Sequence, residues 1–265
     1  AKPAGHTLKG VELQSARYTE GLPDDLPAVR RPLPFAYEAT GAKTQFTNGL
    51  DPNARSRDVF AFHLPETLLR WAKRDTQLRG RLQQMPTLRE EGLWKPQIKA
   101  IKNLEQSLAE GRPRSLIQMA TGSGKTFTSA NFIYRLIRHA DAERVLFLVD
   151  RANLGKQTED EFRQYHPQDD TRAFGELYNI QRLTGNSITK ASRVCISTVQ
   201  RLYSMLRGEE IDPEQDVGSM FESGAAAGGE PLPVEYNPKI PIETFDVIVV
   251  DECHRSIYNL WRQVL

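Results

Sequence analysis

The sequence has few cysteines and no long hydrophobic run, and each shortage excludes a class of protein. Two cysteines, Cys195 and Cys253, are too few for a disulfide framework, which favours a reducing compartment such as the cytoplasm. No apolar stretch approaches the roughly 20 residues that a membrane-spanning helix needs, and the amino end lacks the layout of a signal peptide. We therefore expect a cytoplasmic protein that has no membrane partner.

The net charge is also small, at +1, but the charges are unevenly distributed. Between positions 208 and 242, eight acidic residues accompany one lysine, so this stretch carries −7 and the remainder carries +8. The stretch is rich in glycine, alanine and proline as well, which predicts an acidic flexible insertion over 208–242. The positive remainder is compatible with a polyanionic partner such as nucleic acid.

One stretch combines glycine, lysine and hydroxyl side chains in the pattern of a phosphate-binding loop: Thr121, Gly122, Ser123, Gly124, Lys125 and Thr126. Gly122 and Gly124 would let backbone N–H groups surround phosphate oxygens without a Cβ atom in the way. Lys125 could reach the β and γ phosphates, and Thr126 could place its hydroxyl on Mg²⁺. The sequence therefore predicts a nucleotide site here.

The surroundings of this loop support the prediction, with one departure. The apolar run 115–117 predicts a strand before the loop, and the amphipathic residues 127–138 predict a helix after it. The general pattern has a glycine six residues before the lysine, where Met119 stands. Either this is an ordinary turn, or it is the variant of the loop that nucleic-acid motors use.

Two adjacent carboxylates, Asp251 and Glu252, follow the apolar run 245–250. Placing two carboxylates at the end of a buried strand costs free energy unless a cation neutralises them. In a phosphate-loop enzyme the aspartate holds Mg²⁺ and the glutamate polarises the attacking water. We predict these roles for Asp251 and Glu252, with His254 coupling the nucleotide to a partner surface. The alternative is a pair of solvated acids at the end of a strand.

The order of predicted elements indicates an α/β fold. From position 87 onward, helices alternate with apolar strands at 145–149, 194–196 and 245–250, and the helices cover 95–110, 153–164 and 199–207. This alternation predicts a parallel sheet whose ligands bind at the carboxyl ends of the strands. The sequence of residues 1–86 predicts a mixed α and β structure instead. Its predicted helices lie at 11–18 and 65–74, and its predicted strands lie at 34–40, 44–47 and 59–63.

Residues 121–126, together with Asp251-Glu252-Cys253-His254, resemble the first two signature motifs of superfamily 2 helicases and translocases. The resemblance implies a RecA-like lobe that uses ATP and Mg²⁺, and it implies that Gln97 reads adenine with an amide that both donates and accepts. A solvent-facing glutamine is the alternative. It further implies that three residues after predicted strands contact the nucleic-acid backbone, where helix capping is the alternative: Arg151, Thr198 and Gln200.

A narrower resemblance is to the restriction (motor) subunit of type I restriction–modification enzymes. The stretches 62–68, 147–151 and 197–200 carry it. It implies the C-terminal portion of a restriction-endonuclease-like domain plus linker over 1–86, and the first RecA-like lobe over 87–265. Gln14 and Tyr18 would then form the Gln-x-x-x-Tyr pair that supports the nuclease site. An ordinary polar helix face is the alternative.

This resemblance implies ATP-dependent translocation on double-stranded DNA and DNA cleavage, with modification (methyltransferase) and specificity subunits as partners. Both ends of the chain look cut, so we expect a piece of a longer enzyme, with the second motor lobe and its arginine finger lying elsewhere. We expect the isolated piece to be inactive. Two alternatives stay open: another superfamily 2 DNA or RNA helicase, and a non-catalytic nucleotide-binding regulatory module.

Overall fold

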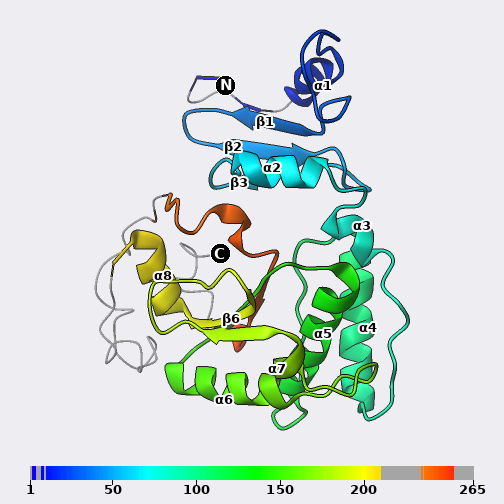
Figure 1. The fold of residues 1–265 in the computed structure, drawn as a ribbon, viewed down its shortest axis with the longest axis vertical. Coiled ribbons are helices and arrows are strands. Elements are labelled where there is room, and N and C mark those ends of the chain that lie inside the picture. The colour runs from blue at the N-terminus through cyan, green and yellow to red at the C-terminus, as the bar shows by residue number, and fades with distance from the viewer. Residues whose placement is uncertain (1, 4–6, 9, 210–233, 235, 254–265) are drawn as a thin grey trace.

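Two β-sheets in different parts of the molecule organise the chain (Figure 1). The computed structural model describes residues 2–3, 7–8, 10–209, 234 and 236–253. Most of the predicted acidic insertion, 208–242, therefore lies outside the described residues, and so does His254. No helix within the described ranges is long and apolar enough to cross a membrane.

The N-terminal part is an antiparallel sheet of order β1-β2-β3 with two helices. Its elements are α1 (Glu12–Glu20), β1 (Phe35–Ala39), β2 (Thr44–Asn48), β3 (Arg57–Val59) and α2 (Pro65–Ala72). The prediction of a strand over 59–63 is wrong, because β3 ends where that stretch begins. The backbone N–H of His63 donates instead to the Tyr37 hydroxyl at 3.2 Å, and the chain turns there into α2. Pro65 suits the first helical position, where its missing N–H costs nothing.

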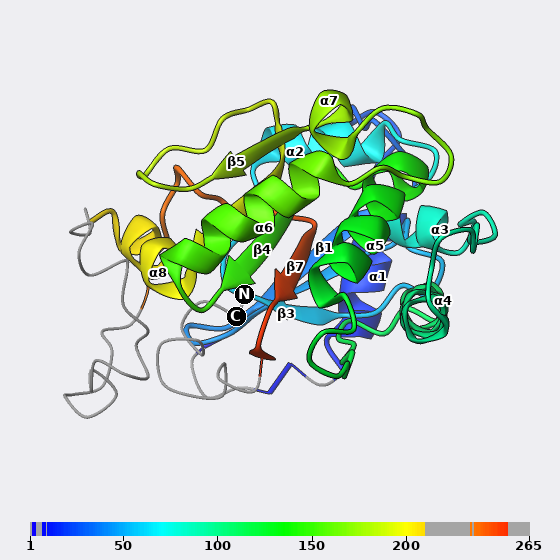
Figure 2. The ribbon, with the colours of Figure 1, turned by 90° about the horizontal axis from the view of Figure 1, so that it is seen from below.

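The second sheet has four parallel strands in the order β5-β6-β4-β7. Its strands are β4 (Val145–Val149), β5 (Asn179–Arg182), β6 (Ser192–Thr198) and β7 (Val247–Val250). Every residue of β4 is buried, as expected of a central parallel strand that is covered on both faces. Seen from below, β4 and β7 lie side by side, with α5 and α6 flanking them (Figure 2).

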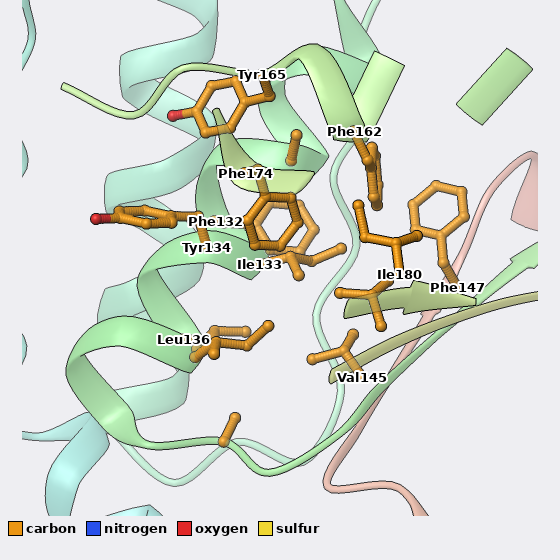
Figure 3. Close-up of a cluster of buried hydrophobic side chains, with 14 of the residues drawn as sticks. Phe132, Ile133, Tyr134, Leu136, Val145, Phe147, Phe162, Tyr165, Phe174 and Ile180 are labelled. Atoms are coloured by element: carbon orange, nitrogen blue, oxygen red, sulfur yellow. The ribbon is translucent and has the colours of Figure 1, made fainter. Parts of the chain in front are cut away.

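Helices cover both faces of this sheet, which confirms the predicted α/β class with a RecA-like parallel sheet. The helices are α3 (Leu78–Leu82), α4 (Lys95–Ala109), α5 (Lys125–Ala140), α6 (Ala152–Gln164), α7 (Phe174–Leu177) and α8 (Val199–Arg207), with the 3-10 helix η2 (Ile242–Thr244) before β7. On one face Val145 and Phe147 pack against side chains of α5, α6 and α7 (Figure 3). On the other face Leu146 and Leu148 pack against α8. Each fully buried side chain of this size contributes about 1.5–3 kcal/mol.

The prediction of a strand over 115–117 is wrong. These residues have no strand pairing, and the side chain of Leu116 is 76% exposed. Ile117 alone packs against the core, so the run is too short to build a buried strand. β7 consequently stands at the end of the described sheet, with Ile248 43% exposed.

The N-terminal part is attached to the parallel-sheet part at several places. At the first, the backbone N–H of Leu64 donates to Glu243 Oε1 at 2.8 Å, just before β7. At the second, Arg79 donates to the carbonyl of Gly111, just after α4, at 3.4 Å, and Arg55 donates to the same oxygen. At a third place, Arg70 of α2 pairs with Glu143 at 3.3 Å, so side chains as well as backbone groups connect the two parts.

Candidate nucleotide-binding site

The glycine-rich loop adopts a conformation that depends on its glycines. Gly122 and Gly124 have φ values of 76° and 78°, in the left-handed region that side chains with a Cβ rarely enter. Gly124 caps α5, and Lys125 is the first residue of that helix. The free N–H groups of the first helical turn therefore lie beside the loop, where an anion is favoured.

Lys125 is paired with a carboxylate from the other end of the described chain. Its Nζ lies 2.9 Å from Oε1 of Glu252, and this hydrogen bond raises the pKa of Lys125. The side chains of Lys125 and Glu252 are 38% and 35% exposed, so the pair is open to a ligand. A phosphate oxygen could replace the carboxylate as the partner of Lys125.

Asp251 and Glu252 continue from β7 in an unusual backbone conformation. The N–H of Asp251 donates to Leu148 at 2.9 Å, which extends the pairing with β4, and Asp251 Oδ1 accepts from the N–H of Glu252 at 3.0 Å. Glu252 has a φ of 50°, which is uncommon for a residue other than glycine and is typical of strained functional sites.

The pKa of Asp251 is raised, by burial first and then by the charge of Glu252. A cation at this carboxylate would favour its ionised form. Mg²⁺ is commonly held by one or two carboxylates together with phosphate oxygens, so Asp251 and the Thr126 hydroxyl fit such an ion chemically. Their roles stay predictions.

Gln97 holds the loop against α4. It is 5% exposed, its Oε1 accepts from the N–H of Trp94 at 2.9 Å, and its Nε2 donates to the carbonyl of Ser123 at 3.2 Å. The alternative of a solvent-facing glutamine does not hold, because the side chain is buried. Reading of adenine by Gln97 stays a prediction, and both ends of its amide are engaged in this structure.

The residues predicted to contact nucleic acid lie at the carboxyl ends of two neighbouring strands. Arg151 caps α6 directly after β4, and Thr198 caps α8 at the end of β6, where it pairs with Val149. The Thr198 hydroxyl accepts from the N–H of Arg201 at 3.1 Å, so it does serve as a helix cap. Gln200 lies in the first turn of α8 and is partly exposed. Contact with nucleic acid stays a prediction for all three.

A shallow pocket at this same edge contains a residue that the sequence did not point to. The ends of β4, β5 and β6 and the first turn of α6 line it, and its polar residues are Arg182, Ser197 and Thr198. Arg182 was missed because β5 was not predicted. In its sequence, Asn-Ile-Gln-Arg, only Ile180 is buried, so there is no apolar alternation to find.

In the N-terminal part, Gln14 and Tyr18 form the side-chain pair that their spacing predicts. Nε2 of Gln14 donates to the Tyr18 hydroxyl at 2.9 Å, on α1. Tyr18 is 68% exposed, so the pair lies on the surface of this part of the molecule. Support of a nuclease site by this pair stays a prediction.

Comparison with known protein families finds a match that covers the candidate site. A family model described as the res subunit of type III restriction enzymes matches residues 91–265, which include the loop, Gln97 and both carboxylates. The chain belongs to this restriction-enzyme family.

Endonuclease subunits of type I restriction enzymes match a longer stretch of the chain. The chain is 29% identical over 235 residues to the endonuclease subunit of the type I restriction enzyme EcoKI from Escherichia coli K12, covering 84% of this chain and 18% of that subunit. It is 30% identical over 172 residues to the EcoAI endonuclease subunit from Escherichia coli, covering 64% and 17%. The resemblance to type I restriction subunits is thus confirmed, although the chain spans less than a fifth of these relatives.

A solved fragment of an HsdR subunit of a type I restriction enzyme from Vibrio vulnificus YJ016 is a more distant structural match. It has a TM-score of 0.37 and 19% identity, and it covers 98% of this chain and 39% of that one. At this score the superposition carries no argument about the site.

Proposed function

We propose that the chain is part of an ATP-dependent double-stranded DNA translocase and endonuclease, the restriction subunit of a type I enzyme. The observation that carries the proposal is the 2.9 Å contact between Lys125 and Glu252. It brings a phosphate-loop lysine within reach of a pair of carboxylates, which is the arrangement that phosphoryl transfer from ATP to water requires. Family membership from position 91 onward supports the same reaction class.

Each residue of the site then has a chemical role. Gly122, Gly124 and the first turn of α5 bind the phosphate oxygens through N–H groups, and Lys125 neutralises part of their charge. Asp251 and Thr126 would hold Mg²⁺, which would supply stabilisation of the charge that develops on the phosphate. Glu252 orients the attacking water and accepts its proton. The ion pair between Lys125 and Glu252 must open, so that the lysine meets phosphate and the carboxylate meets water.

We propose the matching domain organisation and partners. Residues 1–86 are the C-terminal portion of the nuclease-like domain with its linker, and Gln14 and Tyr18 support the nuclease site. Residues 87–265 are the first motor lobe, whose Arg151, Thr198 and Gln200 contact the DNA backbone, and His254 couples nucleotide to partner. Modification and specificity subunits complete the assembly.

Replacement of Lys125 by alanine in the complete subunit tests the reaction. We expect DNA-stimulated ATP hydrolysis to fall at least about 100-fold, because the substitution removes one preorganised cation from the transition state. Lys102→Ala is the matched control, since Lys102 is a half-exposed lysine on α4 paired with Glu90. Phosphate release measured with duplex DNA, at unchanged thermal stability, is the readout. ATP turnover at the parent rate in Lys125→Ala would disprove the proposed role of the loop.

The same assay separates the two alternatives. Stimulation by single strands or by RNA rather than by duplex DNA would indicate another superfamily 2 helicase. Binding of ATP without turnover in the complete protein would indicate a regulatory nucleotide-binding module. The intact set of Lys125, Thr126, Asp251 and Glu252 favours turnover.

A further inference from the structure

Arg182 is an arginine at the end of the outermost described strand of the parallel sheet. It is the last residue of β5, and its side chain lines the shallow pocket with Ser197 and Thr198 at the carboxyl edge. The strand order β5-β6-β4-β7 places this position at the opposite side of the sheet from Asp251. Arg182 therefore lies outside the candidate nucleotide site but on the same edge.

The charge of Arg182 is only partly neutralised by its surroundings. Its Nε is buried without a hydrogen-bond partner, and Oε2 of Glu159 lies 3.5 Å away. The other oxygen of that carboxylate accepts from Arg163, at 3.1 Å from Nε and 2.8 Å from Nη2. The Glu159 carboxylate is thus shared by two guanidinium groups, and Arg163 makes the shorter contacts with it.

The stem of Arg182 is held in place by packing, and its side chain as a whole is partly exposed. A Cβ atom built on Gly155 would lie 3.5 Å from Arg182 Cδ, so the stem packs on the first turn of α6. The side chain is 34% exposed. An arginine with a fixed stem and a partly exposed side chain is suited to contact with a phosphate group.

We propose that Arg182 is a further DNA-contact residue, which binds a backbone phosphate next to the positions of Arg151 and Thr198. The inference rests on the proposed function. Neighbouring strands are about 4.8 Å apart, so the ends of β5, β6 and β4 span about 10 Å, which equals the rise of about three base pairs along the axis of a duplex. The three strand ends together form one row along the DNA backbone.

Salt dependence of duplex binding by the complete subunit tests this contact. Arg182→Met removes the charge and keeps an apolar stem against Gly155. We expect the slope of log affinity against log salt to decrease in magnitude by about 0.9 and the affinity at 0.1 M salt to fall about eightfold, because one fewer counterion is released. Arg182→Lys should retain most of the slope. A random-sequence DNA duplex is the probe.

Arg112→Met is the matched control, because Arg112 is an exposed arginine just beyond α4, away from this edge of the sheet, and pairs with Glu110 at 2.7 Å. We expect its slope to equal that of the parent protein. If Arg182→Met binds DNA with unchanged slope and affinity, the inference is overturned while the proposed function stands. If the parent protein itself shows no salt-dependent duplex binding, the proposed function fails instead.

Discussion

At the scale of residues, the ion pair between Lys125 and Glu252 links two motifs that lie 127 positions apart. Each motif alone was ambiguous, since a Gly-Lys-Thr turn and a pair of acids at a strand end both have ordinary explanations. Their contact, the φ of 50° at Glu252 and the raised pKa of Asp251 are three observations that point to one site. Strained backbone and shifted pKa values cluster at functional sites, so these observations favour a functional role for the ion pair over a purely structural one.

Glu252→Gln separates the binding of ATP from its hydrolysis. The substitution removes the charge that competes with phosphate for Lys125, so we expect ATP affinity to stay equal or rise up to about fivefold, in line with a partly exposed ion pair. Hydrolysis should fall about 100-fold or more, because the proposed general base is lost. A fluorescent ATP analogue measures the affinity, and phosphate release measures the turnover.

Asp251→Asn provides the contrast to that variant. It should weaken Mg²⁺-dependent binding of ATP, since it removes the proposed metal ligand and not the proposed base. Parent-like turnover in Glu252→Gln would assign the base to another residue. Weakened binding in both variants alike would show that the two carboxylates act together as metal ligands.

At the scale of elements, the sequence predicted those that carry a clear apolar run or a clear amphipathic pattern. β4 and α8 have the predicted bounds, because a five-residue apolar run and an amphipathic stretch starting at a threonine cap are strong local patterns. Two predictions failed at short elements: the strand predicted at 115–117 does not form, and β5 forms although it was not predicted. Short elements carry too few apolar residues to decide between strand and loop, so tertiary pairing determines them.

The candidate site could be predicted in its residues but not in its contacts. Lys125, Asp251 and Glu252 follow from motif spacing, and the structure places them together. The buried amide of Gln97 against Ser123 could not be foreseen, because it depends on how α4 packs beside the loop. Nor could the under-neutralised Arg182, whose surroundings come from three strands and a helix.

The loop offers a pair of substitutions that isolates the contact with Gln97. Gly122→Ala and Gly124→Ala both place a Cβ at positive φ, which costs about 1–2 kcal/mol. At Gly124 the new Cβ would also lie 2.6 Å from Gln97 Nε2, whereas at Gly122 it would meet nothing within 4 Å. We expect Gly124→Ala to be less stable by about a further 1 kcal/mol, the worth of the hydrogen bond to Ser123. Urea unfolding of the two variants measures the difference, and equal losses would show that Gln97 does not hold the loop.

At the scale of the whole molecule, the N-terminal part holds the far ends of two of the elements that serve the candidate site, α4 and β7. α4 carries Gln97 in its first turn, and Gly111 beyond its last turn is bound by Arg55 and Arg79. β7 leads to Asp251, and Glu243 ahead of it binds the N–H of Leu64. The proposed nuclease-like part and the nucleotide site are thus connected through α4 and β7. A conformational change in one part could therefore be transmitted to the other through these two elements.

Glu243 is the residue through which the attachment at β7 can be measured. Its Oε1 accepts from Leu64, the residue that caps α2, and its Oε2 is buried without a partner. Glu243→Ala leaves the Leu64 N–H without its acceptor, at a cost of about 1 kcal/mol, so hydrogen exchange across the start of α2 should accelerate about fivefold. Glu66→Ala, at an exposed position in the first turn of the same helix, is the control and should leave exchange unchanged. If α2 exchanges at the parent rate in Glu243→Ala, the attachment of α2 rests on other contacts instead, such as the pairing of Arg70 with Glu143 at 3.3 Å.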